Sequence, residues 1–179
     1  MPDNRDSILA GFPKSRPPLP QADAIATKEY YRKDRDADTT ASYFSSKMKS
    51  WLHHKVSADN RDEHPILSTL EIGAGTLNHL KYEKNHSQYD VIEPYENFYS
   101  GQEELQWIRN HYLDISEVPK GLMYDRVIFI ATFEHITSLP QVVAEAVLHM
   151  KEDACMRIAI PSEGSPMWYL GWRFTTGFE

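Results

Sequence analysis

Two spaced glycines follow an acid at the end of a short apolar run, and this arrangement is suited to holding a ligand. Residues 70–76 read LEIGAGT. Because glycine has no Cβ, Gly73 and Gly75 permit a sharp bend and let a ligand lie against main-chain atoms. The segment predicts a strand-to-helix turn of the nucleotide-binding kind. A tight turn without a ligand is the alternative.

The acid in this motif, Glu71, distinguishes between candidate ligands. A dinucleotide site would have its third glycine at position 78, where the chain has Asn78, and would bring a pyrophosphate close to the Glu71 carboxylate. S-adenosylmethionine (SAM) instead carries an ammonium and a sulfonium group, which a carboxylate attracts. The motif therefore favours SAM. An NAD-dependent oxidoreductase remains a third, weaker hypothesis.

Two further acids follow at the ends of predicted strands. Residues 89–93, YDVIE, predict a second strand that ends in Glu93, about 20 residues past the glycines, where a carboxylate can accept hydrogen bonds from both ribose hydroxyls. Residues 105–113 predict a third strand that brings Asp114 to its carboxyl end, where an acceptor could meet an adenine amino group. Either acid could instead be solvated at a strand end.

The remaining elements alternate between strands and helices. Residues 124–131, YDRVIFIA, form a near-continuous apolar run of the kind buried on both faces of a parallel sheet. A helix over 139–150 and a strand over 155–160 follow, and a helix beginning at Thr39 or Thr40 precedes the glycines. This alternation predicts an α/β fold, a Rossmann-like doubly wound parallel sheet with helices on both faces and ligands at the carboxyl ends of its strands.

Over roughly residues 67–161, the glycine turn, the acidic strand end, Asp114 and the Y-D-x-V…F-E-H-I segment together resemble class I SAM-dependent methyltransferases, particularly the small-molecule group. Leu77 departs from the pattern, since many members have a third glycine there, and it should narrow the turn. By resemblance, the residues expected to bind the cofactor are Glu71, Gly73, Ala74, Gly75, Glu93, Pro94, Asp114, Ile115, Ile130 and Ala131.

The resemblance implies transfer of a methyl group from SAM to an oxygen or nitrogen of a small molecule, such as a sugar, a lipid or a natural-product intermediate. In-line attack on the sulfonium methyl needs mostly positioning of the two reactants. If a general base is required, His135 and Glu163 are the candidates. The alternative is a SAM-binding fragment or interaction module without turnover.

Composition narrows the class of protein further. The net charge of -7 disfavours a nucleic-acid partner, which would call for a basic face. No apolar run approaches a membrane span, and the first 20 residues lack the apolar region of a secretory signal. Cys155 is the single cysteine, so no disulfide forms and a cytoplasmic protein is expected. The adjacent His53 and His54 point apart on a helix, so no metal site is expected.

The predicted organisation has three parts: a flexible arm over 1–27, a helical segment over 28–60 that could act as a lid, and a SAM-binding domain over 61–179. The methyltransferase fold would continue through two more strands, so the sheet is expected to lack its last two. Aromatic residues crowd the segment from 168 to 174. An unfinished sheet with an open edge and exposed aromatic side chains predicts a homodimer or an aggregation-prone chain.

Overall fold

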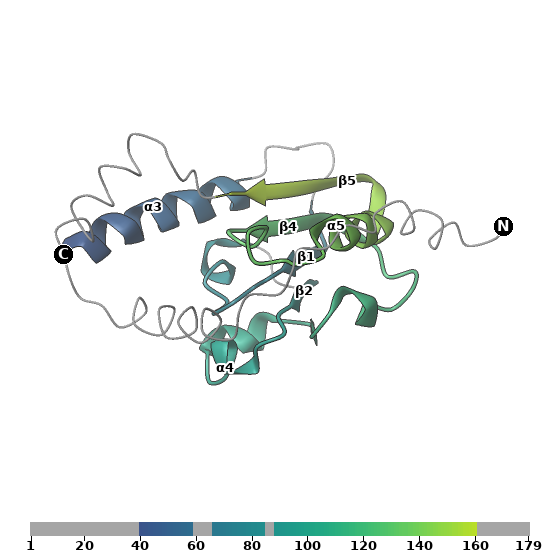
Figure 1. Ribbon diagram of the computed structural model, residues 1–179, viewed down its shortest axis with the longest axis horizontal. Coiled ribbons are helices and arrows are strands. Elements are labelled where there is room, and N and C mark those ends of the chain that lie inside the picture. The colour runs from purple at the N-terminus through teal and green to yellow at the C-terminus, as the bar shows by residue number, and fades with distance from the viewer. Residues whose placement is uncertain (1–39, 59–65, 85–87, 161–179) are drawn as a thin grey trace. The chain divides into compact units, whose positions relative to one another are not determined.

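The computed structural model describes residues 40–58, 66–84 and 88–160 (Figure 1). The described residues belong to two compact units, one comprising residues 40–52 and the other residues 53–160. Helix α3 (Thr40–Ser57) runs through both units, and only its end, from His53 onward, belongs to the unit that holds the sheet. Its first residue agrees with the predicted start. The predicted arm over 1–27 lies outside the described residues.

The unit over 53–160 is built on one five-stranded sheet in which every pairing is parallel (Figure 1). The strand order is β3-β2-β1-β4-β5. This order confirms the predicted Rossmann-like fold. Its strands are β1 (Thr69–Ile72), β2 (Tyr89–Ile92), β3 (Asn110–Tyr112), β4 (Tyr124–Ile130) and β5 (Met150–Ala159).

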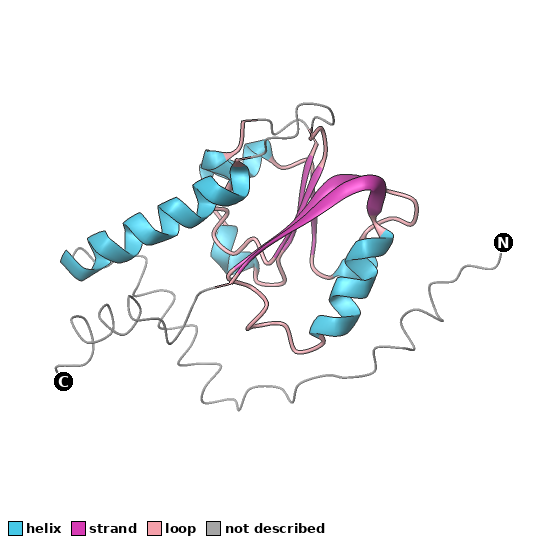
Figure 2. Ribbon diagram, turned by 90° about the horizontal axis from the view of Figure 1, so that it is seen from above, coloured by secondary structure: helices cyan, strands magenta, loops and turns pink. Residues whose placement is uncertain are grey.

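The chain builds the sheet outward from β1 toward β3, then returns to the other side of β1 to add β4 and β5. The strand order therefore reverses between β1 and β4. Because crossovers between parallel strands are right-handed, building the sheet in two directions puts the connections on opposite faces of it. Helix α5 (Leu139–Leu148), which joins β4 to β5, lies on one side of the sheet (Figure 2). The other connections hold α4 (Glu96–Tyr99) and the 3-10 helices η1 (Leu80–Tyr82), η2 (Glu103–Trp107) and η3 (Ile115–Glu117).

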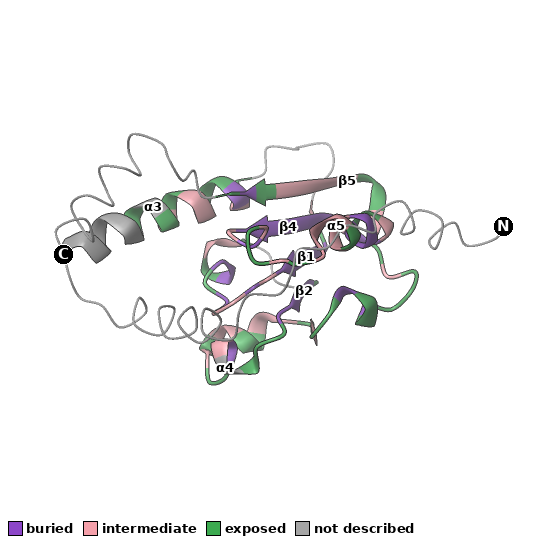
Figure 3. Cartoon of the chain, in the orientation of Figure 1, coloured by how far each residue is buried: buried purple, intermediate pink, exposed green. Residues whose placement is uncertain are grey.

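The core lies around the central strands, and β1, β2 and β4 are its most buried elements (Figure 3). Burying each large apolar side chain contributes about 1.5 to 3 kcal/mol to the stability of the fold, so these three strands hold the loops at their carboxyl ends in place. The central cluster comprises Leu70, Ile72, Ile92, Ile115, Val118, Tyr124, Val127, Phe129 and Ala146.

Three predicted elements differ from the structure. The third strand covers only Asn110–Tyr112, because residues 103–107 turn into η2 and leave Leu105 exposed. The fifth strand begins at Met150, not Cys155, because Met150 pairs with Tyr124 of β4 ahead of a register shift, and hydropathy alone does not mark the polar residues between Met150 and Cys155 as a strand. The glycine turn leads into a helix, as predicted, but this helix is the short 3-10 helix η1.

No helix among the described residues combines the length and the hydropathy needed to cross a bilayer. The predicted absence of the sheet's last two strands concerns chain beyond Ile160, and residues 161–179 lie outside the described part. The aromatic segment from 168 to 174 lies there as well.

Candidate cofactor site

The first glycine of the turn is needed because β4 passes close to it. Gly73 has a φ of +76° and donates its N–H to the Ile92 carbonyl at 2.8 Å. A Cβ on Gly73 would overlap the side chain of Thr132, coming within 2.6 Å of Oγ1. Thr132 is itself fixed, since Oγ1 donates to the Ile130 carbonyl at 2.9 Å. Sequence reasoning did not assign a role to Thr132, whose only signal is its position directly after β4.

The second glycine borders open space. Gly75 has a φ of +53°, and within the described part of the chain no atom beyond its two sequence neighbours lies within 4 Å of the place where its Cβ would be. Its N–H donates to Oε2 of Glu93 at 2.8 Å. The other carboxylate oxygen, Oε1, accepts from the main chain of Tyr95 at 3.0 Å. The turn after β1 and the acid after β2 therefore meet at one edge of the sheet.

The Glu93 carboxylate can accept further hydrogen bonds in this position. Burial raises the pKa of Glu93, and the main-chain donors Tyr95 and Gly75 partly offset that effect. Each carboxylate oxygen has two lone pairs and uses one of them on a main-chain N–H. The remaining acceptor capacity, next to a position without a Cβ, fits a ligand that offers neighbouring hydroxyl donors.

Leu77, which stands where the family often has glycine, has a φ of +61°. This left-handed conformation costs a residue with a Cβ about 1 to 2 kcal/mol. The Leu77 side chain is completely buried, which offsets the strain. The backbone at Leu77 thus has a conformation that glycine adopts easily, but the residue there contributes a side chain to the core.

Glu71 lies inside the protein beneath the turn. It is 2% exposed, and its Oε2 accepts a hydrogen bond from the Tyr89 hydroxyl at 2.9 Å. Burial raises the pKa of Glu71, while the nearby His79 lowers it. The electrostatic partners of this acid are therefore side chains of the protein.

An ion network lies next to Glu71 and joins η1 to β4. Glu83 contacts His79 Nε2 at 2.6 Å and the Arg126 guanidinium at 2.6 Å. Burial opposes the charge on Glu83, but the His79 hydrogen bond and Arg126 together lower its pKa. Arg126 also donates to Thr69 Oγ1 at 3.0 Å. Sequence reasoning missed this network, because Arg126 stands within an otherwise apolar run.

The adenine-side residues follow β3. Asp114 is exposed and caps η3, with Oδ1 accepting from the Ser116 N–H at 2.9 Å and from the Ser116 hydroxyl at 2.6 Å. Its Oδ2 takes no part in these two bonds. Ile115 belongs to the hydrophobic core, so only its main chain could contact a ligand.

The remaining cofactor candidates lie at the carboxyl ends of β1, β2 and β4. Pro94 is exposed, whereas Ala74 and Ile130 are buried. Ala131 has a φ of +50° and donates its N–H to the Ala159 carbonyl at 2.8 Å. All of them lie at the carboxyl edge of the sheet, whose strand order reverses between β1 and β4.

Of the two candidate bases, His135 and Glu163, the structure describes only His135. The His135 side chain is 43% exposed, and its Nε2 lies 3.9 Å from Oε1 of Glu134. Glu163 lies outside the described residues. Within the described ranges, no group of three or more histidine, cysteine or acidic side chains could hold a metal ion.

The sheet order and the turn geometry define a Rossmann-like fold, and solved structures of methyltransferases share this fold. DesVI of Streptomyces venezuelae matches with a TM-score of 0.50 at 16% identity, over 72% of this chain and 61% of that one. The plantazolicin methyltransferase BpumL, in complex with a pentazolic desmethylPZN analog and S-adenosylhomocysteine (SAH), gives 0.54 at 16% identity, over 84% and 62%. The sugar N-methyltransferase KedS8 from Streptoalloteichus sp ATCC 53650 gives 0.51 at 19% identity, over 77% and 55%.

The chain is thus structurally similar to small-molecule methyltransferases, and it spans 55 to 62% of the length of these three solved chains. No family model matches the sequence, and no curated protein matches it. At these identities the likeness establishes the fold and leaves the activity to be proposed.

Proposed function

We propose that this chain binds SAM and acts as a methyltransferase on an oxygen or nitrogen of a small molecule. The observation that carries the proposal is the meeting of Glu93 with Gly75. A buried carboxylate, held by two main-chain N–H groups, lies beside a glycine with open space at its Cβ position. In a fold of this type, ligands bind at this edge of the sheet.

Each part of this edge would have its own task. The Glu93 carboxylate would accept the ribose hydroxyls, in charge-assisted hydrogen bonds stronger than those between neutral groups. Gly75 would let the ligand approach the main chain, and Asp114 Oδ2 would accept from the adenine amino group. Gly73 and Thr132 would keep the turn packed on β4. The bound cofactor supplies an electrophilic methyl group on a sulfonium sulfur.

Glu71 would act on the cofactor indirectly in this proposal. Its carboxyl group lies among Tyr89, His79 and Arg126. It would support the turn from beneath and add negative potential on the side where the ammonium and sulfonium lie. His135 and Glu163 remain the proposed bases, and an acceptor that ionises readily would need neither.

Calorimetric titration with SAM, SAH and NAD tests the binding part of this proposal. Binding of SAM and SAH without binding of NAD is expected. Binding of NAD with no response to SAM or SAH would instead support a dinucleotide enzyme. A methyl-transfer assay over a panel of sugars, amines and phenols then separates an enzyme from a SAM-binding module, because the module binds SAM without consuming it.

A further inference from the structure

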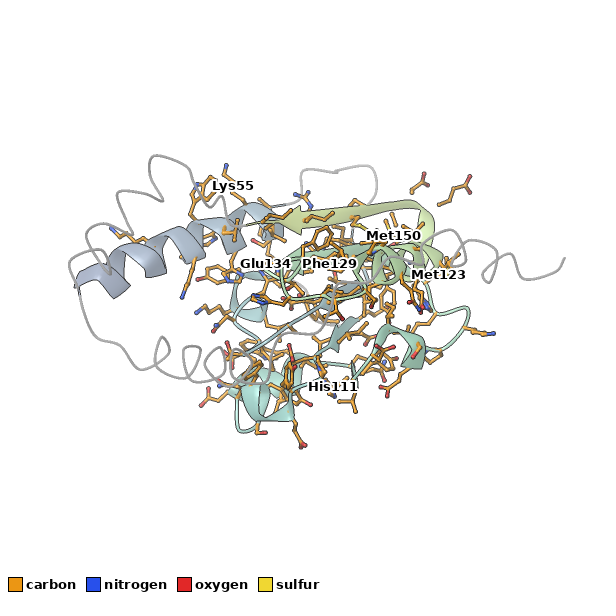
Figure 4. The ribbon with its side chains drawn as sticks, viewed as in Figure 1. Lys55, His111, Met123, Phe129, Glu134 and Met150 are labelled. Atoms are coloured by element: carbon orange, nitrogen blue, oxygen red, sulfur yellow. The ribbon has the colours of Figure 1, made fainter. Side chains whose placement is uncertain are left out.

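His111 connects β3 to the loop that carries Glu93. Its Nε2 lies 3.0 Å from the main-chain carbonyl oxygen of Glu93. The ring also packs on Tyr99 of α4, with centroids 4.5 Å apart and planes inclined by 51°. Figure 4 shows His111 beside α4. One side chain thus contacts both ends of the segment from Glu93 to Tyr99.

The partners of His111 fix the positions of its protons. A carbonyl oxygen can only accept a hydrogen bond, so Nε2 must be protonated and must donate to the main-chain carbonyl of Glu93. In the neutral ring Nδ1 is then an acceptor, and it faces the Tyr99 hydroxyl at 3.4 Å. That distance is long for a hydrogen bond, so the shorter Nε2 contact makes the larger contribution.

The bond from His111 completes the main-chain restraints on Glu93. The Glu93 N–H donates to the Tyr112 carbonyl at 3.0 Å, and its carbonyl accepts from His111. Both backbone polar groups of Glu93 are therefore held by β3. From this fixed start the carboxylate reaches the N–H groups of Gly75 and Tyr95 at 2.8 and 3.0 Å. Losing the His111 donor would release one of the two restraints.

We propose that His111 is a positioning residue that acts through Glu93, holding the end of β2 so that the Glu93 carboxylate stays on the Gly75 N–H and faces the ribose of the cofactor. This inference rests on the proposed binding of SAM and assigns His111 no contact with it. The role predicts that removing the donor weakens cofactor binding only while Glu93 is present.

A double-mutant cycle tests this coupling. We expect His111→Phe, which keeps an aromatic ring but lacks the donor, to weaken SAH binding roughly three- to tenfold in calorimetry. His111→Gln, whose amide can still donate, should recover most of this loss. In a Glu93→Ala background, His111→Phe should have no further effect on SAH affinity. Equal losses in both backgrounds would overturn the inference.

A measurement without cofactor separates positioning from general destabilisation. Hydrogen exchange at the Gly75 amide should become faster in His111→Phe, relative to exchange in the core strand β4. Val118→Ala serves as the destabilising control, since Val118 is a buried core residue and the hydrogen bonds described above for Glu93 join it to Gly75, Tyr95, His111 and Tyr112 instead. It should lower the melting temperature without changing the affinity for SAH. Unchanged Gly75 exchange in His111→Phe would count against the positioning role.

The outcomes distinguish this inference from the proposed function. Wild-type protein that binds neither SAM nor SAH would overturn both. Wild-type protein that binds SAH, together with a weakened Glu93→Ala variant and an unaffected His111→Phe variant, would overturn the positioning role alone.

Discussion

The carboxylate of Glu93 accepts a hydrogen bond of 2.8 Å from the main-chain N–H of Gly75, although 18 positions separate the two residues in the sequence. The parallel pairing of β1 with β2 brings them together, because each residue follows the carboxyl end of one of these strands. The bond joins the two loops in which the sequence shows its strongest ligand-binding motifs. Glu93 and Gly75 therefore hold the two loops together, in addition to the contacts with the cofactor that we propose for them.

Replacing Glu93 with alanine should weaken SAH binding by roughly ten- to a hundredfold, since hydrogen bonds to a charged group contribute about 1.5 to 3 kcal/mol. The change also removes the acceptor for Gly75 and Tyr95, so a lower melting temperature is expected. Calorimetry and thermal unfolding measure the two effects separately. Glu93→Gln keeps an oxygen acceptor without the charge and should fall between wild type and alanine. An unchanged SAH dissociation constant in folded Glu93→Ala would place this acid outside the binding site.

The two glycines of the turn should respond differently to alanine. Gly73→Ala would bring a Cβ into the Thr132 side chain at a φ of +76°, so we expect a marked loss of stability. The Cβ of Gly75→Ala meets no atom of the residues that the structure describes, and its backbone strain should cost about 1 to 2 kcal/mol. Its Cβ would occupy the proposed cofactor volume, so Gly75→Ala should lose affinity for SAH beyond its loss of stability. Denaturant unfolding and calorimetry compare the pair, and equal SAH affinity of wild type and Gly75→Ala would argue against a ligand at this turn.

Arg126→Met should destabilise the protein by about 3 to 5 kcal/mol, because it leaves the buried Glu83 carboxylate without its cation. Urea unfolding at neutral pH measures this loss. The double variant Glu83→Gln with Arg126→Met removes both charges and should recover part of the stability. If the double variant is no more stable than Arg126→Met alone, the ion pair is not the source of the effect.

Glu71 and Glu83 should give opposite pH dependences of stability. The folded-state pKa of Glu71 is raised above 4.5, mainly by burial, so the free energy of unfolding should fall as pH rises from 4.5 through that pKa. Glu71→Gln should remove the Glu71 part of this decline and leave the part that comes from Glu93, whose pKa burial also raises. The comparison is made by urea unfolding across a pH series.

Glu83 provides the matched control for that series. Its folded-state pKa lies below 4.5, because the hydrogen bond from His79 and the charge of Arg126 outweigh the effect of burial. Its contribution to stability is therefore present above pH 4.5 and lost as pH falls through the folded-state pKa. Glu83→Gln should flatten the acid side of the profile and leave the decline above pH 4.5 in place. Identical profiles for the two variants would contradict both assignments.

Leu77→Gly should lower stability even though it removes a residue from a left-handed conformation. The strain relieved is about 1 to 2 kcal/mol, whereas deleting a completely buried leucine side chain costs about 2 to 5 kcal/mol. The net loss should be up to about 4 kcal/mol by denaturant unfolding. A more stable Leu77→Gly variant would show that strain dominates at this position.

The sequence by itself determined the strand that ends at the glycine turn, the acid after β2 and the parallel α/β class, because each rests on local chemistry. Glycine is needed where φ is positive, and continuous apolar runs form strands that are buried on both faces. These features predicted a doubly wound parallel sheet with ligands at the carboxyl ends of its strands. The limits of β3 and β5 escaped prediction, since pairing with neighbouring strands, more than hydropathy, decides where they begin.

Only the tertiary structure decided which glycine faces the protein and which faces open space. Gly73 and Gly75 look alike in the sequence, but Thr132, which follows β4, fills the space beside the first alone. The same holds for Glu71, which is buried against Tyr89, and for Arg126, whose charge is balanced by Glu83. Burial and charge pairing depend on groups that arrive from distant parts of the chain, so no local pattern can specify them.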